Sequence, residues 1–227
     1  MRSVVSAAFV HVFTASGIFC ALLATLATLD AKYEQAFLWL GVAFLIDGLD
    51  GALARRYRVK DVLPLVSGET LDLVIDYVTY VFVPALMLIQ ADILPGPGGV
   101  VLAGLMCMSS LYHFSDEGSK ADDHCFVGFP AIWNVVAFYL FAFPLPALAV
   151  AAIVLACVVL TFVPFKWVHP VRVTSLRGVT LAGTVAFGLA AAETIWRGFP
   201  ATGLSAIALA AVLAYGIGLS LYFGRAR

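Results

Sequence analysis

The chain has 227 residues, of which 63% are hydrophobic and 12% charged, and its mean hydropathy is +1.01. Soluble domains are about 45–50% apolar and about 25% charged, so this composition excludes a soluble globular protein and indicates an integral membrane protein. The net charge of −1 says little by itself, and four widely spaced cysteines without a CxxC pair argue against a zinc or redox site.

Apolar runs near the length needed to cross about 30 Å of hydrocarbon recur along the chain. The first run exceeds twenty residues, which is longer than the apolar part of a signal peptide, so it is predicted to be a spanning helix. Breaks rich in proline and glycine separate later runs. We predict an all-α bundle of about eight transmembrane helices, forming a single domain over residues 1–227. The predicted helices are residues 6–29, 35–56, 67–90, 97–114, 129–144, 147–164, 177–196 and 201–223, and the fifth and sixth are the shortest.

Lysine and arginine are distributed unequally between the two predicted sides of the membrane. Eleven lie on one side, and only Lys32 and Arg197 lie on the other. Because cytoplasmic loops carry the excess of positive charge, both termini are predicted to be cytoplasmic in a multi-pass protein of the cell inner membrane. The eleven residues are Arg2, Arg55, Arg56, Arg58, Lys60, Lys120, Lys166, Arg172, Arg177, Arg225 and Arg227.

Four aspartates interrupt the second and third apolar runs. At 1.5 Å per residue, Asp47 and Asp76 lie about 12 Å inward from the cytoplasmic ends of their helices, and Asp50 and Asp72 about 6 to 8 Å inward. Spacings of three and four residues place each pair on one helix face. A short connection makes the two helices antiparallel neighbours. We therefore expect the four carboxylates to meet near the cytoplasmic surface.

Carboxylates at that depth must be protonated or neutralised by cations. Oxygen ligands without a nearby cysteine favour Mg²⁺ or Mn²⁺ over zinc, and two divalent ions would balance four carboxylates. Structural ion pairs with Arg55 and Arg56 are an alternative, but they would serve only one or two of the four. A divalent-cation transporter that uses the same four aspartates is another alternative, which the lack of internal repeats disfavours.

A pattern of eight positions spans residues 47–76: Asp47-x2-Asp50-Gly51-x2-Ala54-Arg55, then Gly68-x3-Asp72-x3-Asp76. At all eight positions it resembles the signature of the CDP-alcohol phosphotransferases. Twelve residues separate Arg55 from Gly68, which is a longer spacer than most of the family has. The spacer, the segments 126–141 and 162–173, and about two extra C-terminal helices resemble the bacterial branch of the family that acts on choline.

This resemblance implies a metal-dependent reaction in which CDP-diacylglycerol and choline give phosphatidylcholine and CMP. It implies that Asp47, Asp50 and Asp72 hold a pair of Mn²⁺ or Mg²⁺ ions, and that Asp76 adds a ligand or acts as base toward the acceptor hydroxyl. It also implies a homodimer, and no nucleic-acid partner is expected. The residues expected to contact the CDP-diacylglycerol donor are Gly51, Ala54, Arg55, Gly68 and Thr14, and Lys166 is a candidate for its phosphates.

The acceptor alcohol is harder to predict from the residues themselves. The quaternary ammonium of choline binds best against aromatic faces, and the candidates are Tyr77, Tyr112 and Trp133, with Asn134 beside them. The alternative is an interfacial aromatic belt. Serine, inositol or glycerol 3-phosphate could serve as acceptor in the same chemistry, but a shortage of free basic residues and the long spacer count against them.

Overall fold

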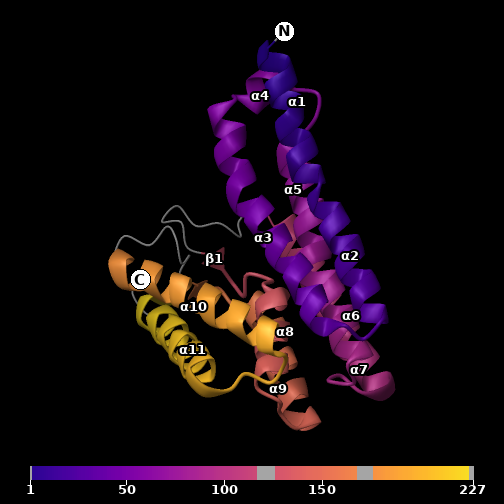
Figure 1. Cartoon of the computed structure of the whole chain (residues 1–227), viewed down its shortest axis with the longest axis vertical. Coiled ribbons are helices and arrows are strands. Elements are labelled where there is room, and N and C mark those ends of the chain that lie inside the picture. The colour runs from indigo at the N-terminus through magenta and orange to yellow at the C-terminus, as the bar shows by residue number, and fades with distance from the viewer. Residues whose placement is uncertain (1, 117–125, 168–175, 225–227) are drawn as a thin grey trace.

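The computed structural model describes residues 2–116, 126–167 and 176–224, and most of these residues are helical (Figure 1). Within this described part, six helical stretches are long and apolar enough to cross a membrane. The protein is therefore an all-α, multi-pass membrane protein. The six stretches are Ser3–Leu29, Tyr33–Arg56, Gly68–Gln90, Gly96–Ser115, Arg177–Arg197 and Gly203–Tyr222.

The fifth and sixth predicted spans are helical but short. Helices α8 (Trp133–Ala142) and α9 (Ala147–Thr161) have 10 and 15 residues, and at 1.5 Å per residue neither reaches about 30 Å. Prolines limit both helices, because Pro130 precedes α8 and Pro144 and Pro146 separate α8 from α9. The prediction of eight full-length spans is thus confirmed for six.

The first span consists of α1 (Arg2–Ala15) and α2 (Gly17–Leu29), which meet at Ser16. The Ser16 hydroxyl donates a 2.6 Å hydrogen bond to the carbonyl of Phe13, a contact that often bends a helix. Helix α3 (Tyr33–Arg56) returns alongside α2 and α1 and ends with two arginines in its last turn, where cations stabilise the helix dipole. The single-turn helix α4 (Val59–Val62) follows α3.

The third span is not a uniform α-helix. It begins as α5 (Gly68–Asp76), passes through a π-helical turn, η1 (Tyr77–Phe82), and continues as α6 (Val83–Gln90). Pro84 has no N–H to donate to the carbonyl of Tyr80, so one ordinary helical hydrogen bond is missing here. Wider turns of this kind are frequent at functional sites.

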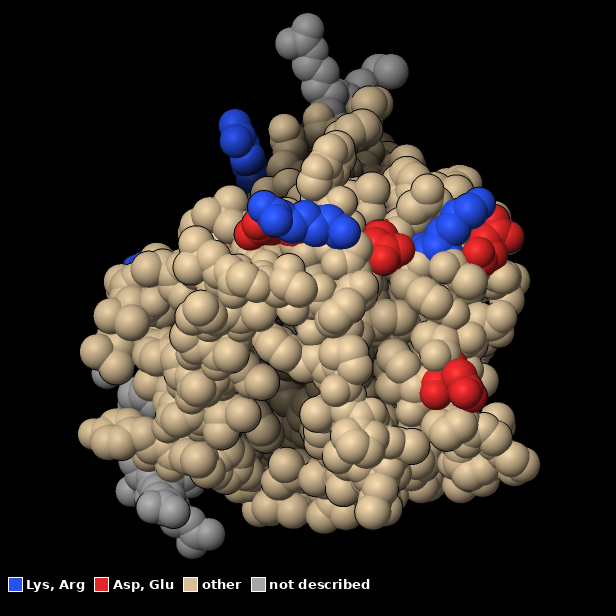
Figure 2. Space-filling view, turned by 60° about the horizontal axis from the view of Figure 1, so that its bottom comes forward, with Lys and Arg blue, Asp and Glu red and all other residues tan. Residues whose placement is uncertain are grey.

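Helix α7 (Gly96–Ser115), α6 and α8 surround the largest group of buried side chains, which includes the fully buried Met87, Leu88, Met106 and Trp133. Strands β1 (Phe126–Val127) and β2 (Lys166–Trp167) are two residues each and pair antiparallel. Figure 2, turned so that the bottom of Figure 1 comes forward, shows a face that is largely uncharged, as a membrane protein requires.

The last two helices, α10 (Arg177–Arg197) and α11 (Gly203–Gly224), form a hairpin that lies apart from α1 and α2 (Figure 1). An aromatic cluster attaches the hairpin to the rest of the protein, since Phe199 packs 5.3 Å from Phe37 and 5.7 Å from Phe138 between ring centres. The Tyr139 hydroxyl adds a hydrogen bond to the carbonyl of Leu209. The four aspartates of the signature are on α3 and α5, which are not part of this hairpin.

Candidate active site

Three of the four signature aspartates converge between α3 and α5. One carboxylate oxygen from each of Asp47, Asp50 and Asp72 lies within 4.8 Å of the other two. Asp50 is only 6% exposed, and the other two are half-buried. Ligand oxygens on opposite sides of one Mg²⁺ are about 4.2 Å apart, which is twice the metal–oxygen distance. An all-oxygen donor set at this spacing fits a divalent cation.

Asp76 lies one turn beyond Asp72 on α5 and is outside this group of three. It is half-buried and is the last residue of α5 before the π-helical turn. Four aspartates were expected to lie together, and three of them form this close group. The fourth is displaced along the helix toward the membrane interior.

The local sequence explains why α5 begins where it does. Ser67 caps the helix, because its hydroxyl oxygen accepts a 3.1 Å hydrogen bond from the backbone N–H of Thr70. With the helix start fixed at Gly68, Asp72 falls one turn inside α5. Helix α1 packs against both α3 and α5, so three helices hold the carboxylates in place.

Tyr80 belongs to this site, although the sequence analysis did not select it. Its hydroxyl donates a 2.5 Å hydrogen bond to Oδ2 of Asp47, and its side chain is only 9% exposed. Asp72, Asp76 and Tyr80 follow one another at intervals of four residues. This spacing could have identified Tyr80 from the sequence, because it places the three residues near one face of a helix. A hydrogen bond of this kind orients a carboxylate that serves as a metal ligand.

Replacing Tyr80 with phenylalanine is expected to weaken the affinity for divalent cation by about 10-fold or more, and so to raise the cation requirement, because Asp47 loses the group that orients it. The measurement is the Mn²⁺ concentration that gives half-maximal turnover. Tyr33→Phe is the matched control, since that hydroxyl bonds only the carbonyl of Gln90 at the far end of α3 among the contacts described. Equal Mn²⁺ requirements for Tyr80→Phe and wild type would contradict the prediction.

The residues expected to contact the donor are distributed over α1, α3, α5 and β2. Nη1 of Arg55 lies 3.4 Å from the position that a Cβ on Gly51 would occupy, so the guanidinium folds back along α3. Ala54 packs against the small cluster of Ala7, Val10 and Val59, and Thr14 is buried on α1. Lys166 is in β2, but its side chain is outside the described part of the chain.

The residues expected to bind choline do not form one exposed cage. Trp133 is fully buried, its indole N–H donates to the Ser110 hydroxyl at 2.8 Å, and its ring packs against Phe129. Trp133 is therefore a core residue. Its position in the sequence, at the start of α8, did not indicate this. Tyr112 is 62% exposed and lies against Phe162.

The two remaining candidates for choline binding have local or partly buried contacts. The side-chain oxygen of Asn134 accepts a hydrogen bond from the adjacent backbone N–H of Val135. Tyr77 directly follows Asp76, is half-buried, and donates a hydrogen bond to the carbonyl of Cys107. Of the four candidates, Tyr77 is thus the nearest in sequence to an aspartate of the signature.

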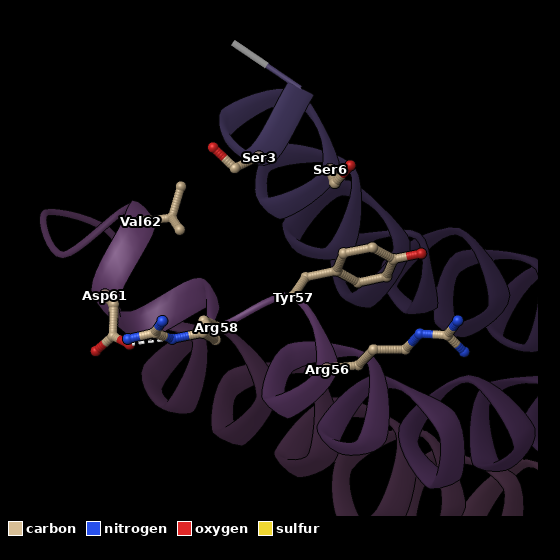
Figure 3. Close-up of a pocket in the computed structure, with 7 residues that line it drawn as sticks. All are labelled: Ser3, Ser6, Arg56, Tyr57, Arg58, Asp61 and Val62. Atoms are coloured by element: carbon tan, nitrogen blue, oxygen red, sulfur yellow. Dashed lines mark hydrogen bonds and ion pairs between the residues drawn. The ribbon is translucent and has the colours of Figure 1, made fainter.

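An open pocket of about 510 Å³ lies between the start of α1 and the α3–α4 turn (Figure 3). It is lined by Ser3, Ser6, Arg56, Tyr57, Arg58, Asp61 and Val62, and Arg58 pairs with Asp61 at 2.9 Å. Arg56 is nine residues beyond Asp47 on α3, which is about half a turn away in direction at 3.6 residues per turn. The pocket therefore lies on another face of α3 from Asp47.

Comparison with known proteins agrees with the signature. Residues 9–164 match the family model of the CDP-alcohol phosphatidyltransferases, a stretch that contains all four aspartates, Tyr80 and helices α2 to α9. The hairpin of α10 and α11 follows this stretch.

Several bacterial proteins named phosphatidylcholine synthase are similar to this chain. The protein from Rhizobium meliloti (strain 1021) is 45% identical over 172 residues, which are 76% of this chain and 71% of that protein. The one from Pseudomonas aeruginosa PAO1 is 43% identical over 175 residues, or 77% and 74%. The one from Rhizobium johnstonii is 41% identical over 172 residues, or 76% and 71%. With a family match over most of its length and a carboxylate cluster built from the signature, the chain belongs to the CDP-alcohol phosphatidyltransferase family.

Proposed function

We propose that this protein is a phosphatidylcholine synthase, which transfers the phosphatidyl group of CDP-diacylglycerol to choline and releases CMP. The observation that carries the proposal is the convergence of Asp47, Asp50 and Asp72 within 4.8 Å inside a helical membrane protein. The similarity to relatives of that name supports the choice of substrates.

The donor carries a negatively charged pyrophosphate, and three carboxylates alone would repel it. We propose that Asp47, Asp50 and Asp72 hold divalent ions, Mn²⁺ or Mg²⁺ and two in number, and that Asp76 contributes to the same centre. When bound, the ions screen the pyrophosphate and stabilise the charge that develops on the departing phosphate. Tyr80 keeps Asp47 oriented for that task.

We propose that Asp76 accepts the proton of the choline hydroxyl. The hydroxyl oxygen then attacks the phosphorus that carries diacylglycerol, and the bond from this phosphorus to the bridging oxygen breaks. CMP leaves with the electron pair of that bond, and the proton passes from Asp76 to solvent. Arg55, which extends along α3 over Gly51, would orient a donor phosphate through paired N–H groups.

Gly51, Ala54, Gly68 and Thr14 would lie along the nucleotide, and Lys166 is proposed for the donor phosphates. For choline we propose the aromatic faces of Tyr77 and Tyr112, because a quaternary ammonium is attracted to the electron-rich face of a ring. Tyr77 adjoins the proposed base in sequence. The half-buried setting of Tyr77 would strengthen such an interaction relative to a ring in water.

We further propose that the site opens to the cytoplasm from the bacterial inner membrane and that the protein is a homodimer. The excess of lysine and arginine near the chain termini and the α3–α4 turn supports the orientation. A site near that surface would be reached by a donor held in the bilayer and by a water-soluble acceptor. The dimer rests on the family resemblance.

The function is tested by measuring CMP release from CDP-diacylglycerol by the purified protein in Mn²⁺. We expect release with choline that stops when a chelator removes the cation. Serine, inositol and glycerol 3-phosphate are offered separately as controls. Release with one of these and not with choline would retain the chemistry and overturn the acceptor, and no release with any alcohol would overturn the proposed function.

A further inference from the structure

His11 on α1 has an unusual environment for a polar side chain in a membrane helix. Its Nε2 atom is buried and has no hydrogen-bond partner among the described residues. Its ring faces the start of α5, where Cε1 lies 3.3 Å and Nδ1 3.7 Å from the position of a Cβ on Gly68. Buried polar atoms in folded proteins are nearly always paired, so an unpaired one calls for a missing partner.

The depth of His11 follows from the packing of α1 against α5, which lie side by side (Figure 1). His11 meets Gly68, and Gly17 meets Ile75, whose Cγ2 lies 2.8 Å from the position of a Cβ on Gly17. Gly17 begins α2, so the first span, made of α1 and α2, runs in the same direction as α5. Asp72 is four residues beyond Gly68, so His11 lies about 6 Å from the level of Asp72, toward the start of α5.

The position separates His11 from the parts of the site that already have assigned roles. The oxygen-only group of Asp47, Asp50 and Asp72 does not include it, so it is not a further ligand of that group. Asp76, the proposed base, lies on the other side of Asp72 along α5. A donor whose pyrophosphate lies at the level of Asp72 and whose reacting end lies toward Asp76 extends its nucleoside in the opposite direction, toward Gly68.

We propose that His11 Nε2 forms a hydrogen bond with the cytidine part of the donor, an inference that rests on the proposed function. The missing side chain of Gly68 leaves the ring room beside α5. A cytosine ring and its ribose offer both donors and acceptors, so either neutral form of the imidazole finds a partner there. Nucleotide binding thus satisfies the buried nitrogen.

The test is equilibrium binding of CMP, in Mn²⁺, to detergent-purified protein by titration calorimetry. His11→Phe keeps a ring but removes both nitrogens, whereas the amide of His11→Gln reaches the position of Nε2. We expect His11→Phe to weaken CMP binding by about 10-fold and His11→Gln to stay within about 3-fold of wild type. Val12→Ala, at an exposed position on the same helix turn, is the matched control and should bind as wild type does.

Inorganic pyrophosphate, titrated in the same way, separates the nucleoside from the phosphates. We expect its binding to be unchanged in His11→Phe, and an equal loss for CMP and pyrophosphate would overturn the assignment. Equal CMP binding by His11→Phe and wild type would also overturn it, whereas no CMP binding by wild type would overturn the proposed function instead. Thermal unfolding is recorded for each variant, and the smaller His11→Asn replaces His11→Phe if the latter does not fold.

Discussion

Replacing Asp76 with asparagine is expected to lower kcat by about 10²- to 10⁴-fold, the usual contribution of a positioned general base. Asparagine has nearly the same shape as aspartate but cannot take the proton of the choline hydroxyl. Asp76 is outside the close group of Asp47, Asp50 and Asp72, and asparagine keeps a side-chain carbonyl oxygen that can face the cations, so CMP should still bind to the variant. The measurements are steady-state CMP release and, separately, equilibrium binding of CMP in Mn²⁺.

Asp92→Asn is the matched control for that loss. Asp92 is exposed in the turn after α6 and has a left-handed backbone conformation (φ 56°), which asparagine adopts readily. The control therefore removes one carboxylate without straining the chain and should retain wild-type turnover. Turnover of Asp76→Asn within a few-fold of wild type would remove Asp76 from the role of base.

Replacing Asp50 with asparagine is expected to abolish cation-dependent turnover and, without cation, to raise the unfolding temperature. Asp50 is only 6% exposed beside two other carboxylates, and buried like charges destabilise a fold when no cation offsets them. Removing one of the three charges relieves that repulsion. Mn²⁺ should then stabilise wild type strongly and the variant weakly, because a cation stabilises only the state that binds it.

Thermal unfolding with chelator and with Mn²⁺ checks this pair of effects, again with Asp92→Asn as control. An Asp50→Asn protein that gains as much from Mn²⁺ as wild type would contradict the assignment of Asp50 as a ligand. A variant that is less stable than wild type in chelator would show that the Asp50 carboxylate has a structural partner, contrary to the repulsion argument.

The parts of the structure that sequence predicted well are those that depend on local pattern. The long apolar runs became six helices of spanning length, and the spacing of Asp47, Asp50 and Asp72 placed three carboxylates together. These features follow from helix periodicity and from the length of one connection. They need no knowledge of how distant side chains pack.

The features that sequence missed depend on tertiary packing. The contact from Tyr80 to Asp47 joins two helices across 33 positions of the chain. Tryptophan is typical of the membrane interface, and only the contacts of Trp133 with Ser110 and Phe129 show that it lies in the core. The buried nitrogen of His11 likewise becomes evident only when α1 is seen against Gly68.

The π-helical turn rotates α6 relative to α5 about the axis of the third span. Each hydrogen bond in such a turn spans one residue more than in an α-helix, so the halves are out of phase by about 100°. In α5, before the turn, Asp72 faces the other carboxylates. In α6, after the turn, Met87 and Leu88 are fully buried. Deleting one residue within Tyr77–Phe82 would turn this segment into a continuous α-helix and rotate one half relative to the other. Asp72 could then no longer face the other carboxylates while Met87 and Leu88 stay buried.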